Sequence, residues 1–219
     1  STVYDCNQPD SRSVGINAAR GSLKAGRLVV VPTDTLYGLA ADAFDGSAVA
    51  ALLRAKGRGR DMPVPVLVGS WTTIDGLVTS VRPEARELIR SFWPGGLSLV
   101  VHAAPSLAWD LGDTRGTVML RMPLHPVILE LLREVGPLAV SSANVSGQPP
   151  ATTVVEARAQ LGESASVYLD GGPTEHGVAS TIFDLTGNRP RIIREGAVSA
   201  EAIAEVLGDD PERLRSGGE

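Results

Sequence analysis

Two pairs of polar residues have types and spacing suited to chemistry: Lys56 with Arg58, and Ser142 with Asn144. In extended backbone, residues two apart point to the same side, so each pair can act on one ligand. Hydrogen bonds between cations and phosphate contribute ~1.5–3 kcal/mol each, against ~0–1 kcal/mol for a surface ion pair. The hydroxyl and the carboxamide add further donors and acceptors. The two pairs together indicate a site for an anionic ligand.

Two polar loops, one after Val31 and one after Val140, each follow an apolar run that is typical of a buried strand. The second loop contains Ser142 and Asn144. In open α/β sheets, ligands bind at the carboxyl ends of strands. We therefore expect the two loops to face one crevice.

The basic pair leaves the end of a predicted helix, Ser47–Lys56, where Gly57 can adopt the left-handed conformation that often ends helices. If the chain is extended beyond that point, Lys56 and Arg58 can reach the same ligand. Arg54 and Arg60 are expected to flank them. An exposed, solvated charge run is the alternative interpretation, and for Arg60 it is an acceptable one.

The pattern along the chain predicts an α/β fold with a mixed sheet, because short apolar runs alternate with helical patterns. Helices are expected to begin near Pro83, after Thr153 and after Ser199. The expected strands are Leu28–Val31, Val64–Val68, Leu97–Val101, Thr117–Leu120, Leu138–Val140, Val167–Leu169, Thr181–Leu185 and Arg191–Ile193.

The chain has 219 residues, of which 43% are hydrophobic, and this predicts one domain over residues 1–208. The charged segment 209–219 has no apolar periodicity and is expected to be a flexible tail. A net charge of −5 argues against a protein that coats nucleic acid, so any RNA binding must be local. Cys6 is the sole cysteine, and no apolar run is long enough to span a bilayer, so we expect a cytoplasmic protein without a membrane anchor.

Several other sites are disfavoured by the sequence. It contains no phosphate-binding loop of the Gly-x-x-x-x-Gly-Lys-Ser/Thr type and no complete dinucleotide fingerprint. The three histidines are expected to have structural or exposed roles. A serine hydrolase would need a nucleophile elbow, which is not found, so hydrolysis is a distant alternative.

Seven short motifs, in this order along the chain, resemble those of the YrdC-like threonylcarbamoyl-AMP synthases in their short, single-domain form. The motifs are Pro32–Leu39, Lys56–Arg58, Trp93–Leu99, Arg121–Pro123, Ser142–Gly147, Ser180–Thr181 and Arg194–Gly196. The resemblance implies a twisted mixed β-sheet flanked by helices around a positively lined concave cavity. Several positions depart from the family pattern: Gly96 and Ser98 stand where proline and threonine are usual, and Glu195 replaces a common proline after Arg194. Leu67 stands where longer members of the family have a histidine.

The resemblance also implies roles for individual residues. ATP would be bound by Lys56, Arg58, Thr117, Ser142, Asn144 and Arg194, with Lys56 and Arg58 in the catalytic role; threonine would be bound by Thr35, Arg121 and Ser180. Arginine can bind a carboxylate through two parallel hydrogen bonds, which suits Arg121 to the threonine carboxylate. The metal would be Mg²⁺ that arrives on the ATP phosphates, without a protein metal site.

The reaction implied is formation of threonylcarbamoyl-AMP and pyrophosphate from L-threonine, bicarbonate or CO₂, and ATP. A separate transferase complex would then modify tRNA, and tRNA itself is a further possible partner. The main alternative is a non-catalytic YrdC-like protein that binds double-stranded RNA or tRNA. A third possibility, carbamoyl transfer in hydrogenase maturation, would require acylphosphatase and zinc-finger segments that are not found in this sequence.

Overall fold

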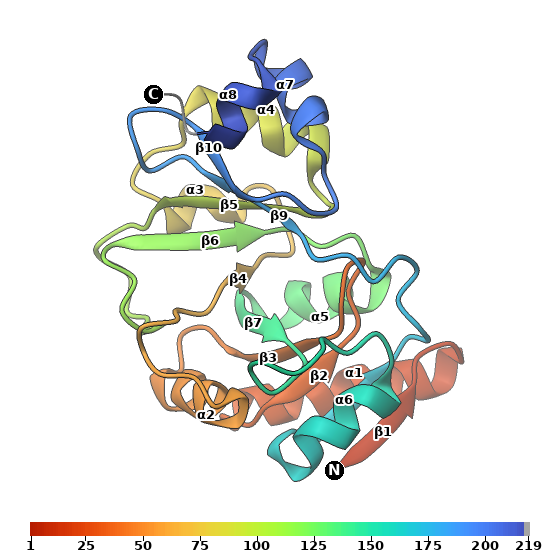
Figure 1. The fold of residues 1–219 in the computed structure, drawn as a ribbon. Helices are drawn as coiled ribbons and strands as arrows, with labels where there is room; N and C mark the ends of the chain where they lie inside the picture. Colours follow the sequence, from red (N-terminus) through yellow and green to blue (C-terminus); the bar gives the residue numbers. More distant parts are fainter. Residues whose placement is uncertain (217–219) are drawn as a thin grey trace.

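The structure is a computed structural model that describes residues 1–216. Its centre is one mixed ten-stranded sheet with the order β1-β8-β2-β3-β7-β4-β6-β5-β9-β10 (Figure 1). The strands are β1 (Thr2–Asp5), β2 (Val29–Val31), β3 (Gly38–Asp42), β4 (Val66–Leu67), β5 (Leu97–His102), β6 (Thr117–Arg121), β7 (Leu138–Ser142), β8 (Val167–Asp170), β9 (Thr181–Asp184) and β10 (Arg191–Arg194). All eight strands predicted from the sequence are present.

Eight α-helices and one short 3-10 helix accompany the sheet within the described residues. They are α1 (Pro9–Lys24), α2 (Gly46–Lys56), α3 (Thr73–Leu77), α4 (Pro83–Phe92), α5 (Pro126–Val135), α6 (Val154–Leu161), α7 (Ala200–Leu207), α8 (Pro211–Ser216) and η1 (Gly162–Ser164). The β2–β3 and β3–β7 pairs are antiparallel, whereas β2–β8 and β4–β6 are parallel. The predicted mixed α/β architecture is confirmed.

Two apolar clusters lie on the two faces of the sheet. Val29 and Val31 of β2 pack in the cluster that includes α1 and α5, whereas Val30 between them packs in the larger cluster with α2, α4 and α7. This division follows from the alternation of side chains along a strand. It explains why β2 is a continuous apolar run, since both of its faces are buried.

Helix α2 ends where the sequence predicts. Asp45 caps its beginning by accepting a hydrogen bond from the Ala48 amide at 3.1 Å. At the other end Gly57 adopts φ 69°, and the Arg58 amide then donates to the Leu53 carbonyl at 2.8 Å. A residue with a side chain rarely adopts that conformation, so Gly57 ends the helix and directs Arg58 away from it.

Strand β3 approaches β7 closely at Gly38. A Cβ atom placed on Gly38 would lie 2.5 Å from Cγ1 of Val140, well inside contact distance. Ladder pairing joins Gly38 to Ser142 and continues to Asp42 and Leu138. Glycine at position 38 therefore permits the two central strands to pair beside the predicted polar loops.

The prediction of a flexible tail from Asp209 is wrong as far as Ser216, because helix α8 forms there. Leu214 is 1% exposed, and Arg215 pairs with Glu195 at 3.0 Å and with Glu201 at 2.6 Å. These contacts attach α8 to the segment after β10 and to α7. Residues 217–219 lie outside the described part of the chain. Within residues 1–216, no helix is long and apolar enough to cross a membrane.

Candidate active site

A cavity of about 380 Å³ lies over the centre of the sheet. Arg58, Arg121 and Arg194 line it, and no carboxylate is among its lining residues. The arginines come from the segment after α2, from the end of β6 and from the end of β10. Different elements thus bring three cations to one hollow, which makes it suited to an anionic ligand.

Six of the nine predicted site residues line this cavity and three do not. Those that line it are Thr35, Arg58, Arg121, Ser142, Ser180 and Arg194; Lys56, Thr117 and Asn144 are not among the lining residues. The expected convergence of the two polar loops is therefore found, because the loop after β2 and the end of β7 both contribute.

Lys56 lies behind the cavity wall and is completely buried. Its Nζ contacts the Ser142 carbonyl, and it donates to the Asn144 carbonyl at 2.9 Å and to Asn144 Oδ1 at 3.1 Å. Ser142 Oγ donates to the same Oδ1 at 2.6 Å. The predicted Lys-x-Arg and Ser-x-Asn residues thus meet, but Lys56 organises the loop rather than facing the hollow.

Burial lowers the pKa of Lys56 to about 7, and the nearby Arg58 guanidinium contributes to the same shift. The oxygen atoms around Nζ favour the protonated form, which offers three donors. Near neutral pH the ammonium and the neutral amine are therefore close in free energy.

Arg58 lies on the other side of the same loop. Its Nε donates to Ser146 Oγ at 2.6 Å, and its Nη1 donates to Ser141 Oγ at 3.3 Å. Gly57 is left-handed, as predicted for the end of the helix, so the condition of extended backbone from Lys56 to Arg58 is not met. Both side chains reach the 141–146 loop nonetheless. Ser141 and Ser146 lie outside the predicted site, which took only Ser142 and Asn144 from this loop.

Arg121 is 6% exposed and is held by three protein acceptors. Its Nη1 donates to Asp34 Oδ1 at 2.7 Å and to the Gly95 carbonyl at 3.1 Å, and its Nη2 donates to Thr35 Oγ1 at 3.1 Å. Asp34 was not predicted as a functional residue, although it stands between two threonines of the loop after β2. The sequence feature that could have indicated Asp34 is an acidic residue between two hydroxyl-bearing residues just after a predicted strand.

Ser180 and Arg194 meet at another part of the cavity wall. Arg194 donates to the Ser180 carbonyl from Nε at 3.1 Å and from Nη2 at 2.8 Å. The Ser180 hydroxyl lies 2.8 Å from Ser98 Oγ. Burial, followed by the charge of Arg121, lowers the pKa of Arg194 from its ordinary value. The two guanidinium groups are therefore close enough to affect one another.

Thr117 begins β6, on the same side of the strand as Met119 and Arg121, which line the cavity. Its hydroxyl donates to the Thr114 carbonyl at 2.8 Å. Thr117 thus lies along the continuation of the cavity floor. It could contact a ligand that extends beyond the enclosed part of the hollow.

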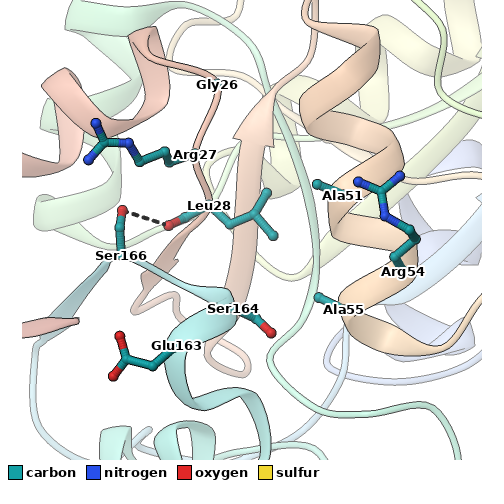
Figure 2. A pocket seen from close by; sticks show the side chains of 9 residues that line it. All are labelled: Gly26, Arg27, Leu28, Ala51, Arg54, Ala55, Glu163, Ser164 and Ser166. Carbon is teal, nitrogen blue, oxygen red and sulfur yellow. Dashed lines mark hydrogen bonds between the residues drawn. The ribbon is translucent and has the colours of Figure 1, made fainter.

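The two flanking arginines do not join the cavity. Arg60 is exposed and pairs with Asp110 at 2.8 Å and with Asp113 at 3.3 Å. Arg54 lies on α2 and lines a separate hollow, which Arg27 and Glu163 also line (Figure 2). The solvated interpretation of Arg60 is confirmed, and the expectation that Arg54 flanks the site is wrong.

A second cavity, of about 480 Å³, adjoins the first at the loop after β2. Thr33 and Thr35 line both hollows, whereas Asp34 lines only the second. His125, which caps α5 by accepting a hydrogen bond from the Val127 amide at 3.2 Å, also lines it. The ion pair of Asp34 with Arg121 thus joins a wall of the second cavity to a wall of the first.

The comparisons with known proteins agree with this geometry. A family model that groups Sua5, YciO and YrdC, described as "Telomere recombination", matches residues 21–196. The chain belongs to this family. The predicted family and the YrdC-like fold are thereby confirmed.

A relative from Mycobacterium tuberculosis, provisionally named a threonylcarbamoyl-AMP synthase, is 68% identical over 97% of this chain and 98% of its own length. The threonylcarbamoyl-AMP synthase of Pyrococcus abyssi is 36% identical over 89% of this chain, which spans 57% of that longer protein. These names support the catalytic interpretation over the RNA-binding alternative.

Comparison with solved structures supports the same family and fold. The structure of Pyrococcus abyssi Sua5 complexed with L-threonine has a TM-score of 0.89 and is 32% identical, covering 98% of this chain and 62% of its own. The structure of Escherichia coli YciO has a TM-score of 0.79 at 22% identity, covering 92% of this chain and 96% of its own, so it shows the shared fold alone.

Proposed function

We propose that the protein is a nucleotidyltransferase that forms L-threonylcarbamoyladenylate and pyrophosphate from L-threonine, bicarbonate or CO₂, and ATP. The observation that carries this proposal is a single cavity in which a buried, oriented Arg121 lies close to Arg194 and shares the walls with Arg58. Arg121 would bind the threonine carboxylate, with Thr35 and Ser180 beside it.

Arg58 and Arg194 are the cations that would bind the nucleotide phosphates, and the Ser142 hydroxyl would join them by turning its proton from Asn144 Oδ1 to a phosphate oxygen. Lys56 and Asn144 would support them from behind, because the Lys56 ammonium holds the backbone and side-chain oxygens of the loop that carries Ser142. Thr117 would contact the part of the nucleotide that extends along β6. An array of fixed donors of this kind stabilises charge without having to reorganise during the reaction.

The chemistry explains why cations are needed. The threonine amine attacks CO₂ and loses a proton, which gives a carbamate anion. A carbamate oxygen then attacks the α-phosphorus, the bond from that phosphorus to the bridging oxygen breaks, and pyrophosphate leaves. Two anions have to approach one another in this step, so Arg58 and Arg194 would offset their repulsion and stabilise the in-line transition state.

Mg²⁺ is expected to enter with ATP, and it would neutralise charge on the phosphates. The cavity fits a metal carried in this way because Mg²⁺ prefers oxygen ligands, and hydroxyl oxygens such as that of Ser142 line the cavity. Within the described residues, no group of three or more His, Cys, Asp or Glu side chains is placed to hold a metal ion. The protein would thus contribute neutral oxygens around a metal already bound to phosphate.

The product is a mixed anhydride that water can hydrolyse. We infer that it is passed to a separate transferase that modifies tRNA, in the cytoplasm. Direct binding of tRNA to this chain is not required for the reaction proposed.

The test is pyrophosphate release from ATP and Mg²⁺, with and without L-threonine and bicarbonate. We expect release that requires both, and Arg58→Ala should lower kcat by about 100-fold, as for removal of one preorganised donor. Arg60→Ala is the matched control, since Arg60 lies on the same segment but pairs at the surface. If folded wild-type protein shows no threonine-dependent release, the synthase is excluded and tRNA affinity becomes the next measurement.

A further inference from the structure

We propose that Asp34 is a positioning and specificity residue: it fixes the edge of Arg121 that faces the cavity and makes this subsite select a carboxylate over a phosphate. The proposal rests on the function proposed above and adds a residue to it. Asp34 does not line the substrate cavity, so it would act through Arg121 rather than on the substrate.

The hydrogen bonds of Arg121 define which of its edges is free. A guanidinium has five N–H donors. Both donors of Nη1 are occupied, by Asp34 Oδ1 and by the Gly95 carbonyl, and one donor of Nη2 is occupied by Thr35 Oγ1. The Nε–H and the second Nη2–H remain. These belong to neighbouring nitrogens and form the edge that can bind a carboxylate through two parallel hydrogen bonds.

The loop that carries Asp34 is held in place by its own hydroxyls. Thr33 Oγ1 donates to the Leu36 carbonyl at 2.5 Å, and it accepts from the Thr35 amide at 3.1 Å. The Thr35 hydroxyl lies 3.1 Å from Thr33 Oγ1 and can donate to it while accepting from Arg121. Asp34 is therefore presented to Arg121 by a hydrogen-bonded turn, and rotation of the guanidinium would break three contacts at once.

Charge gives the second part of the argument. Arg121 and Arg194 line the same cavity, and together they would attract a phosphate as well as a carboxylate. The Asp34 carboxylate neutralises Arg121. Arg194, in contrast, lines a cavity that has no carboxylate among its described lining residues. The Arg121 subsite then has too little net positive charge to favour a phosphate dianion, and a monoanionic carboxylate fits it.

The experiment compares Asp34→Asn and Asp34→Glu with the wild type in threonine-dependent pyrophosphate release. Asp34→Asn keeps an acceptor oxygen but removes the charge. We expect its threonine KM to rise about 10-fold, the range for a hydrogen bond to a charged group, with the ATP KM nearly unchanged. Inorganic phosphate should become a competitive inhibitor against threonine in Asp34→Asn, and should not compete with threonine in the wild type or in Asp34→Glu.

Asp10→Asn, in the exposed first turn of α1, is the matched control for loss of a carboxylate. Unchanged threonine KM and unchanged phosphate sensitivity in Asp34→Asn would overturn the proposal, and so would equal rises in both KM values. If Asp34→Asn does not fold, Asp34→Glu decides: a raised threonine KM without phosphate inhibition supports the proposal, and an unchanged one contradicts it. A wild type without threonine-dependent release would instead refute the proposed function.

Discussion

Lys56 shows how a cation can serve a phosphate site without facing it. Its side chain is completely buried and its Nζ is surrounded by oxygens of Ser142 and Asn144. A buried charge of this kind costs free energy unless it is hydrogen-bonded throughout. The carbonyl and amide oxygens provide that compensation, and in return they are fixed in position. The loop at the end of β7 is therefore organised before any ligand arrives.

The pH dependence of stability tests this arrangement. The pKa of Lys56 is about 7 in the folded protein, against an ordinary value of 10.5 in the unfolded chain. Between these values the unfolded state binds one more proton, so the free energy of unfolding contributed by this group rises with pH, by at most ~1.4 kcal/mol per pH unit, and is flat below the lower value. Lys56→Met should remove this rise, as measured by denaturant unfolding at several pH values.

Other groups titrate in the same range, so the comparison must be between the variant and the wild type. Cys6, whose pKa burial raises to about 11, contributes in the opposite direction, because its folded pKa lies above its ordinary value. It is present in both proteins and cancels in the difference. Identical pH slopes for Lys56→Met and the wild type would show that Lys56 stays charged across the window.

At the scale of elements, α8 has the clearest expected contribution to the free energy of unfolding. Leu214 is 1% exposed and Arg215 contacts three carboxylates, on Glu195, Glu201 and Glu212. Glu195 also accepts from the Ala200 amide at 2.8 Å. The Glu195 carboxylate is therefore held by α7 and α8, which explains how Glu195 can stand next to Arg194, the residue proposed above to bind phosphate.

Leu214→Ala should lower the free energy of unfolding by about 2–4 kcal/mol, because it removes a fully buried side chain. Val155→Ala on α6 is the control, since Val155 is 79% exposed and its truncation should change stability little. Denaturant midpoints for the two variants would check this. Equal, small effects would mean that α8 is only loosely attached in solution.

Three of the elements that the sequence analysis missed, β3, β1 and α8, share a physical cause. Strand β3 contains no β-branched residue, and Gly38 reads as a turn, yet its close approach to β7 makes it central. Strand β1 is mostly exposed at the sheet edge and has no apolar alternation to detect. Helix α8 has Leu214 as its single buried residue, so no period is visible in the sequence. Tertiary contacts, rather than the local sequence pattern, determine the structure of these three elements.

For the site, residue type and spacing indicated Lys56, Arg58, Ser142 and Asn144, whereas the resemblance supplied Arg121. Neither indicated Asp34, because its role depends on the distance from Asp34 Oδ1 to Arg121 Nη1, across residues far apart in the chain. The side chains that face the hollow could not be distinguished from those behind it either. Gly57 reverses the chain locally, and a reversal of this kind changes which side each neighbour faces.

The whole molecule combines an overall charge of −5 with an arginine-lined cavity. The arginines of this cavity are expected to attract ATP despite the negative charge of the whole chain. Salt screens such interactions, with a Debye length of ~8 Å at physiological ionic strength. The ATP KM should therefore rise as NaCl increases, whereas the KM of threonine, a zwitterion with no net charge, should change much less. Steady-state kinetics over a salt series would check this, and parallel changes in both KM values would contradict it.

The tight contact at Gly38 has a consequence for how this scaffold can change. Strands β3 and β7 pair without room for a Cβ atom between Gly38 and the side chain of Val140, so a larger residue at position 38 would have to displace Val140, which lines the cavity. Met62 and Pro63, by contrast, line the cavity from the connection between α2 and β4, outside the strands of the sheet. New substrates are therefore easier to accommodate by redesigning this rim than by altering the strands beneath it.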